Sequence, residues 1–173
     1  MNRNLSSLVQ WLLMVLAIAG LSACQTVPPS SAMAFTAAQR EALIKRGFED
    51  GGGNYLLGLN NRLLFGFDTS AIDPPQDAML RTLASELAAV GIRGAKVEGH
   101  ASNEGDPQHN LILSRRRAEA VSAALTAGGF DAKRMQVVAL GATDPVASNR
   151  DATGRRQNRR VVIVVTPADT LPI

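Results

Sequence analysis

Apolar residues recur with a helical spacing in two long segments of the chain, residues 73–91 and 110–127. The first begins with an aspartate and two prolines, which is typical of a helix start, and a glycine marks the end of each segment. We therefore predict two long helices, each with one buried face. The positions expected to be buried are Leu80, Leu83, Ala84, Leu87 and Ala88 in the first helix and Leu111, Ser114, Ala118, Val121 and Leu125 in the second.

Shorter apolar runs at residues 95–99, 136–140 and 160–166 predict strands. The last run contains five consecutive apolar residues, Val161 to Val165, which indicates a strand that is buried on both faces or central in its sheet. The polar segments that separate these elements predict loops.

Ahead of these elements, the sequence predicts a short N-terminal extension. Thr36 begins a capping-box pattern that predicts a helix ending at Gly47. Three glycines then break the chain, and apolar runs at residues 55–59 and 62–67 flank two asparagines, which favours a hairpin. The overall order β-α-β-α-β-β implies an α/β (α+β) fold, a two-layer sandwich of helices on a mixed sheet.

The first 23 residues have the pattern of an export signal. Fifteen of them are hydrophobic, Arg3 is the only charged one, and the apolar run from Leu8 to Ala19 is short for a membrane span. Leu21-Ser22-Ala23-Cys24 then resembles the lipobox of bacterial lipoproteins, in which a lipid is attached to the cysteine. Cys24 is the only cysteine, so no disulfide forms within the chain. A transmembrane anchor and a buried structural cysteine are the alternatives.

The chain thus divides into four predicted parts. We expect a signal peptide over 1–23, a lipidated cysteine with its tether over 24–35, a helix and strand extension over 36–60, and the main domain over 61–168. Several acyl chains on Cys24 would anchor the protein stably. In lipoproteins of this kind, Gln25 in place of aspartate favours the outer membrane.

Charge is unevenly distributed along the chain, whose formal net charge is +3. Residues 25–114 carry seven Lys/Arg and ten Asp/Glu, whereas residues 115–160 carry ten and four. A basic C-terminal half indicates an anionic partner or a carboxylate ligand. Nucleic acid is the usual partner of such a patch, but an exported, lipid-anchored chain would not meet it, so we predict no nucleic-acid partner.

The usual catalytic patterns are missing from the sequence. There is no Gly-x-Ser-x-Gly elbow and no phosphate-binding glycine loop, and His100 and His109 lack a metal-ligand spacing. Candidates for the carboxylate pair of a glycoside hydrolase are Asp68, Glu104 or Asp106, but acidic loop residues are more often solvated. We therefore predict a non-catalytic protein without metal or cofactor, with a cell-wall hydrolase as the remaining alternative.

Arg117 stands out within a run of three arginines, residues 115–117. On a helix these side chains spread over about 200°, so they cannot all serve one site. Arg117 lies one turn before Val121, at the border of the buried face, where a guanidinium suits paired hydrogen bonds to a carboxylate. The alternative is a structural ion pair with Glu98 or Asp68.

Four ordered motifs between residues 63 and 165 carry a resemblance. They are Phe67-Asp68-Thr69-Ser70, Glu98-Gly99-His100-Ala101, Asn110-x-x-Leu113-Ser114-x-x-Arg117-Ala118-x-x-Val121 and Gly154-Arg155-x-x-Asn158-Arg159-Arg160-Val161. Together they resemble the OmpA-like peptidoglycan-binding domain, which is shared with the Pal lipoproteins. The lipobox, the 36–48 helix and segments 63–66 and 145–149 resemble, more closely, the YfiB-type lipoproteins.

The resemblance implies non-covalent binding of peptidoglycan by a domain that lies in the periplasm and tethers the outer membrane to the cell wall. The diaminopimelate of the peptide stem would occupy a pocket between the loop after Gly99 and the second long helix, with Arg117 taking its carboxylate. The other implied or candidate contacts are Asp68, Thr69, Ser70, Ser102, Gly105, Asn110, Asn158 and Arg159.

Ser102 departs from the family pattern, which has an aspartate there to meet the ligand ammonium. Such a charge-assisted contact contributes about 1.5 to 3 kcal/mol, or roughly 10- to 150-fold in affinity. Peptidoglycan binding is therefore expected to be weakened, unless Glu104, Asp106 or Asp68 supplies the charge.

The resemblance to YfiB-type lipoproteins implies a second function, that of a signalling adapter. Such an adapter sequesters a periplasmic repressor of a diguanylate cyclase and so raises cyclic di-GMP. Here Leu43, Phe48 and Tyr55 of the N-terminal extension are candidate partner-binding residues, with ordinary core packing as the alternative. The sequence leaves a homodimer open.

Overall fold

The computed structural model describes residues 34–59, 65 and 69–170. The helices among them are α2 (Ala37–Lys45), α3 (Pro74–Ala89), α4 (Pro107–Ala127) and α5 (Ala152–Asn158), with the short 3-10 helices η2 (Ala132–Arg134) and η3 (Pro167–Asp169). The strands are β1 (Glu49–Asp50), β2 (Tyr55–Gly58), β3 (Ala95–His100), β4 (Met135–Gly141) and β5 (Val161–Val165). Within these described ranges, no helix has the length and apolar character needed to cross a bilayer.

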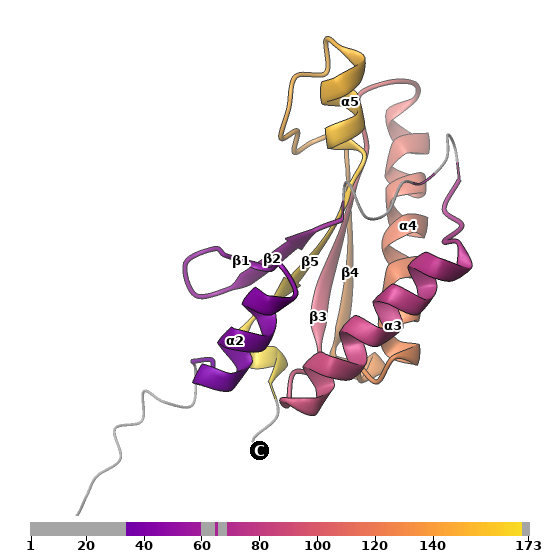
Figure 1. Cartoon of the computed structure of the whole chain (residues 1–173). Helices are drawn as coiled ribbons and strands as arrows, with labels where there is room; N and C mark the ends of the chain where they lie inside the picture. Colours follow the sequence, from indigo (N-terminus) through magenta and orange to yellow (C-terminus); the bar gives the residue numbers. More distant parts are fainter. Residues whose placement is uncertain (1–33, 60–64, 66–68, 171–173) are drawn as a thin grey trace, which may run out of the picture. The chain divides into compact units, whose positions relative to one another are not determined.

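The strands form one sheet in the order β1-β2-β5-β3-β4 (Figure 1). β3 and β4 are parallel and the other neighbours are antiparallel, so the predicted mixed sheet is confirmed. β5 lies between β2 and β3 and all five of its residues are buried, as its unbroken apolar run predicts. α4 packs along β3 and β4 and against α3, which gives the predicted two layers.

Capping side chains fix where α2 and α3 begin. Thr36 accepts a hydrogen bond from the backbone N of Gln39, and the Gln39 side chain accepts one from the backbone N of Thr36. Asp73 and Gln76 make the same pair of bonds at the start of α3. The predicted helices at these positions are confirmed, because each capping pattern lies within a few residues of sequence.

The start of α4 differs from the prediction. α4 begins at Pro107 rather than near Asn110, because Asp106 caps it by accepting a hydrogen bond of 2.7 Å from the backbone N of His109. Four of the five positions predicted to be buried are buried, but Leu111 is 37% exposed.

The structure also forms elements that the sequence prediction lacked. α5 lies within the polar segment between β4 and β5, which was predicted to be a loop. The glycines that were expected to break the chain instead form the turn of a β1–β2 hairpin, where Asp50 Oδ1 accepts hydrogen bonds from the backbone N of Gly52 and of Gly53. Gly52 and Gly53 have φ of 82° and 104°, which a side chain would disfavour. The second arm of the predicted hairpin, residues 62–67, lies outside the described residues except for Phe65.

The N-terminal extension is packed into the core of the domain. Leu43, Phe48 and Tyr55 are buried in the same hydrophobic cluster as residues of β5 and α3. The ring of Tyr55 also meets that of Phe35 edge to face, with centroids 5.3 Å apart. Ordinary core packing, the alternative to partner binding, thus accounts for these three candidate residues.

Candidate ligand-binding site

A pocket of about 180 Å³ lies between the loop that follows β3 and the first turns of α4. Its lining consists of Ala101, Ser102, Glu104, Gly105, His109, Asn110, Leu113, Arg117 and Arg159. The structure therefore brings together most of the candidate ligand residues named from the sequence. Thr69, Ser70 and Asn158 are outside this lining, and Asp68 lies outside the described residues.

α4 forms one side of the pocket because Gly99 of β3 allows the helix to pack closely against the sheet. A Cβ atom on Gly99 would lie 2.0 Å from the backbone oxygen of Ser114, so only glycine fits there. The hydroxyl of Ser114 donates to the backbone oxygen of Leu111 at 2.8 Å and accepts from the backbone N of Gly141 at 3.1 Å. The contact joins α4 to the ends of β3 and β4 and orients the helix.

Arg117 is the charged residue in the wall of the pocket that is most deeply buried. Its side chain is 2% exposed, Nε donates to the backbone oxygen of Thr69 at 2.9 Å, and the guanidinium carbon lies 5.0 Å from the centroid of the Phe65 ring. These contacts hold the plane of the guanidinium in one orientation. Glu98, one of its suggested ion-pair partners, instead pairs with Lys96 at 2.6 Å.

Asn110, on the same helix as Arg117, fixes the loop after β3 that forms part of the pocket lining. Its Nδ2 donates to the backbone oxygens of Ser102 and Glu104, at 3.2 and 2.7 Å. Gly105, with φ of 82°, makes the turn that follows. Ser102 is 4% exposed, so the position where the family pattern has an aspartate is a buried hydroxyl in this chain.

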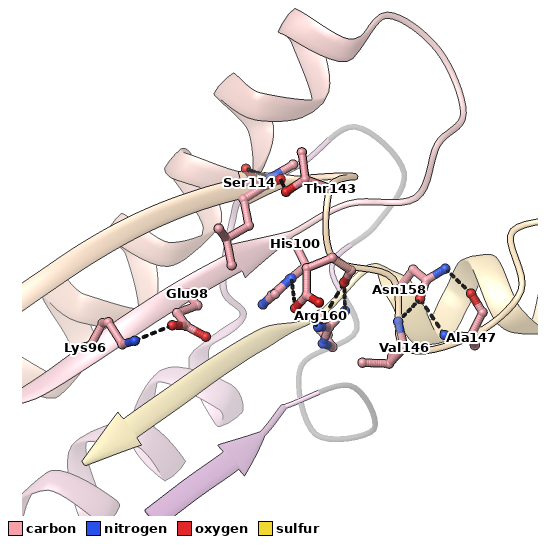
Figure 2. Close-up of polar contacts among 12 residues, drawn as sticks. Lys96, Glu98, His100, Ser114, Thr143, Val146, Ala147, Asn158 and Arg160 are labelled. Atoms are coloured by element: carbon pink, nitrogen blue, oxygen red, sulfur yellow. Dashed lines mark hydrogen bonds and ion pairs between the residues drawn. The ribbon is translucent and has the colours of Figure 1, made fainter. Parts of the chain in front are cut away.

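Asn158 is not part of the pocket lining; it binds the loop at residues 146–149, as Figure 2 shows for Val146 and Ala147. Its Oδ1 accepts from the backbone N of Val146 and Ala147, and its Nδ2 donates to the backbone oxygen of Ala147 and to Oδ1 of Asn149, all at 2.8 to 3.0 Å. Asn149 Oδ1 also accepts a longer bond, 3.4 Å, from the backbone N of Asn103 in the pocket loop. Asn149 ends the segment 145–149 that resembles the YfiB-type lipoproteins, but the sequence gives it no role at the pocket, because that role depends on two loops that meet only in the fold.

The match to known proteins covers the same part of the chain as the pocket. Residues 64–159 match the OmpA family. This chain belongs to that family. It is 38% identical over 152 residues to the outer-membrane lipoprotein YfiB of Pseudomonas aeruginosa, covering 88% of this chain and 89% of that protein. The lipoprotein YfiB of Escherichia coli is 35% identical over 133 residues, 76% of this chain and 83% of that protein.

A solved structure is similar to the OmpA-family domain of this chain. The crystal structure of the peptidoglycan-associated lipoprotein from Burkholderia pseudomallei has a TM-score of 0.55 and 33% sequence identity. The match covers 60% of this chain and 88% of that one. The OmpA-like fold expected from the four motifs is thereby confirmed.

A second, open groove of about 630 Å³ is lined by residues of β3 and β5 together with Gly47, Glu49 and β2 residues of the N-terminal extension. His100 and Arg160 line it, next to Asp144, whose Oδ2 lies 3.7 Å from His100 Nδ1 and 3.1 Å from Arg160 Nη2 (Figure 2). Burial, and then the charge of Arg160, lower the pKa of His100. The described residues contain no group of His, Cys, Asp and Glu that could hold a metal ion.

Proposed function

We propose that this chain is a lipid-anchored outer-membrane protein whose OmpA-family domain binds peptidoglycan without catalysis and so tethers the outer membrane to the cell wall. The observation that carries the proposal is the Arg117 guanidinium, buried and oriented in the pocket wall. A guanidinium held in this way suits the planar carboxylate of diaminopimelate. A similar solved structure is named as a peptidoglycan-associated lipoprotein, which supports peptidoglycan as the binding partner.

The remaining candidate residues take different parts in this proposal. Ser102, Gly105 and Asn110 line the pocket together with Arg117, and Arg159 contributes a second cation to the lining. Thr69 acts through its backbone oxygen, which orients Arg117. The hydroxyl of Ser102 can accept a hydrogen bond from the ligand ammonium but brings no charge, so binding is weaker than with a carboxylate there.

Co-sedimentation with purified sacculi tests the proposal. The chain from residue 25 onwards should pellet with diaminopimelate-type sacculi, and free diaminopimelate should compete. Arg117→Lys keeps the charge but loses the planar fork, so we expect at least about a tenfold loss of binding. Arg116→Lys is the matched control, because Arg116 is the exposed neighbour on the same helix. Equal pelleting of both variants would assign wall binding to another part of the protein.

The proposed lipid anchor is tested separately. We expect lipid on Cys24, which lies outside the described residues, and the relatives are named as lipoproteins of the outer membrane or as lipoproteins. Cys24→Ser should move the protein from the membrane fraction to the soluble fraction of the cell envelope. Retention of this variant in the outer membrane would argue for another means of attachment.

A signalling adapter is the second candidate function. The similarity to the Pseudomonas aeruginosa lipoprotein spans 152 residues, whereas the family match spans residues 64–159, so it reaches into the N-terminal extension. Ile44, next to the buried Leu43, is 61% exposed and offers the surface that a periplasmic repressor would need. Ile44→Asp should abolish capture of that repressor and spare wall binding. Unchanged capture would exclude this face of α2.

A further inference from the structure

The rim of the pocket holds a carboxylate that belongs to the protein itself. The carboxylate oxygens of Glu104 lie 2.9 Å from Nε of Arg155 and 3.6 Å from Nη1 of Arg159. Both arginines belong to α5 and the residue that follows it, whereas Glu104 lies in the loop after β3. Two guanidinium groups thus converge on one carboxylate at the edge of the site, where Glu104 and Arg159 line the pocket.

The segment that carries these arginines is held by contacts that do not involve Glu104. Nη1 of Arg155 donates to the backbone oxygen of Asn149 at 3.1 Å, and the backbone N of Arg159 donates to the backbone oxygen of Arg155 at 3.1 Å. Asn158, fully buried, ties the same segment to the loop at residues 146–149. The segment, and the Arg155 guanidinium with it, would therefore stay at the rim if the Glu104 carboxylate moved away, and Arg159 would remain beside it on the same segment.

The side chain of Glu104 can move while the backbone of its loop, which lines the pocket, stays in place. Its backbone oxygen accepts a hydrogen bond of 2.7 Å from Nδ2 of Asn110, which fixes the loop independently of the carboxylate. The Glu104 side chain is 53% exposed, and ion pairs with this exposure contribute little because water screens them. Exchanging the Glu104 carboxylate for a carboxylate of the ligand therefore costs little free energy.

We propose that Arg155 and Arg159 form a second carboxylate-binding position at the rim of the pocket, and that Glu104 holds this position until a carboxylate of the ligand displaces it. The inference rests on the proposed function, in which the ligand is a peptide stem. Such a stem carries the α-carboxylate of its γ-linked D-glutamyl residue in addition to those of diaminopimelate. Arg117 takes one carboxylate and the Arg155–Arg159 pair takes another, because guanidinium groups favour planar anions.

Glu104 is then a specificity-determining residue. A ligand with a free glutamyl α-carboxylate replaces the interaction that Glu104 gives up, whereas a ligand with an amide at that place does not. Removing the Glu104 charge should strengthen binding of the first kind of ligand and leave the second unchanged. If Glu104 were only a support for the loop, its removal would weaken both.

Titration calorimetry with two synthetic tripeptides distinguishes these two effects of Glu104 on affinity. One is L-alanyl-γ-D-glutamyl-meso-diaminopimelate, and the other is the same peptide with its glutamyl α-carboxylate amidated. For the full chain in detergent, we expect Glu104→Gln to bind the acid peptide about two- to fivefold more tightly and the amidated peptide unchanged. Glu119→Gln, which removes the same charge from an exposed position on α4, should leave both affinities within twofold.

The outcomes separate this inference from the function on which it rests. Acid-peptide affinity that is equal or lower in Glu104→Gln, with the unsubstituted protein binding normally, would overturn the second position alone. Failure of the unsubstituted protein to bind either peptide would count against the proposed function and remove the second position with it.

Discussion

Neighbouring residues at the end of β3 and the start of β5 face different sides of the domain. Ser102 lines the pocket and His100 lines the open groove, and the same division separates Arg159 from Arg160. In each pair one polar side chain lines the pocket and the other, which is buried, lines the groove. The two ends of β3 and β5 thus supply polar groups to two separate places in the domain.

His100 makes the stability of the domain depend on pH. Its side chain is 1% exposed, and among the described residues neither ring nitrogen has a hydrogen-bond partner. Burial and the nearby Arg160 lower its pKa in the folded state, whereas the unfolded chain keeps a value of about 6.5. Above about pH 6.5 both states hold the ring neutral, and below it the unfolded state alone binds the proton.

We therefore expect the free energy of unfolding to fall as pH drops from about 6.5 towards the lowered native pKa, by up to about 1.4 kcal/mol per pH unit. Urea denaturation between pH 5 and 8 measures this slope, and His100→Gln should flatten it. His109→Gln, which removes the other histidine of the sequence, should keep it. A slope that survives in His100→Gln would assign the pH dependence to other groups.

At the scale of elements, the contact between β3 and α4 positions the pocket. Gly99→Ala would drive a Cβ into the backbone oxygen of Ser114, and a backbone atom cannot move aside as the end of a side chain can. We expect the free energy of unfolding to fall by about 3 kcal/mol or more. Chemical denaturation of the unsubstituted protein and of Gly99→Ala measures this loss in the free energy of unfolding.

Gly52→Ala is the matched control for this substitution. Gly52 has open space around it and a φ of 82°, so an alanine there should cost only about 1 kcal/mol of backbone strain. Equal losses for the two variants would mean that the approach of α4 to β3 does not limit the stability of the domain.

Elements with local signals could be predicted from the sequence. α2 and α3 carry their capping residues within one turn, and β5 is apolar throughout. α5 could not be predicted, because its seven residues have no apolar face and its place is set by Asn158, whose partners lie about ten residues away along the chain. The same reason hid Asn149 and the Glu104 ion pairs, since both require loops that only the folded sheet brings together.

At the scale of the whole molecule, the N-terminal extension and the OmpA-family domain share one core. β2 pairs with β5 from Tyr55↔Val165 to Gly58↔Val162, and Leu43 of α2 is fully buried in the common cluster. Leu43→Ala should lower the free energy of unfolding by about 2 to 5 kcal/mol within a single cooperative transition. Ile44→Ala, one residue away but exposed, should change it by less than about 0.5 kcal/mol. Two separate transitions in a thermal melt would contradict a shared core.

The central claim is that the pocket lined by Arg117 is where the cell wall binds. Titration of the ¹⁵N-labelled chain with meso-diaminopimelate, followed by amide chemical shifts, tests it most directly. We expect saturable shifts concentrated in residues 101–110 and around Arg117, which Arg117→Lys abolishes and Arg116→Lys retains. Shifts confined to the open groove near His100 and Asp144, or identical in both variants, would contradict it.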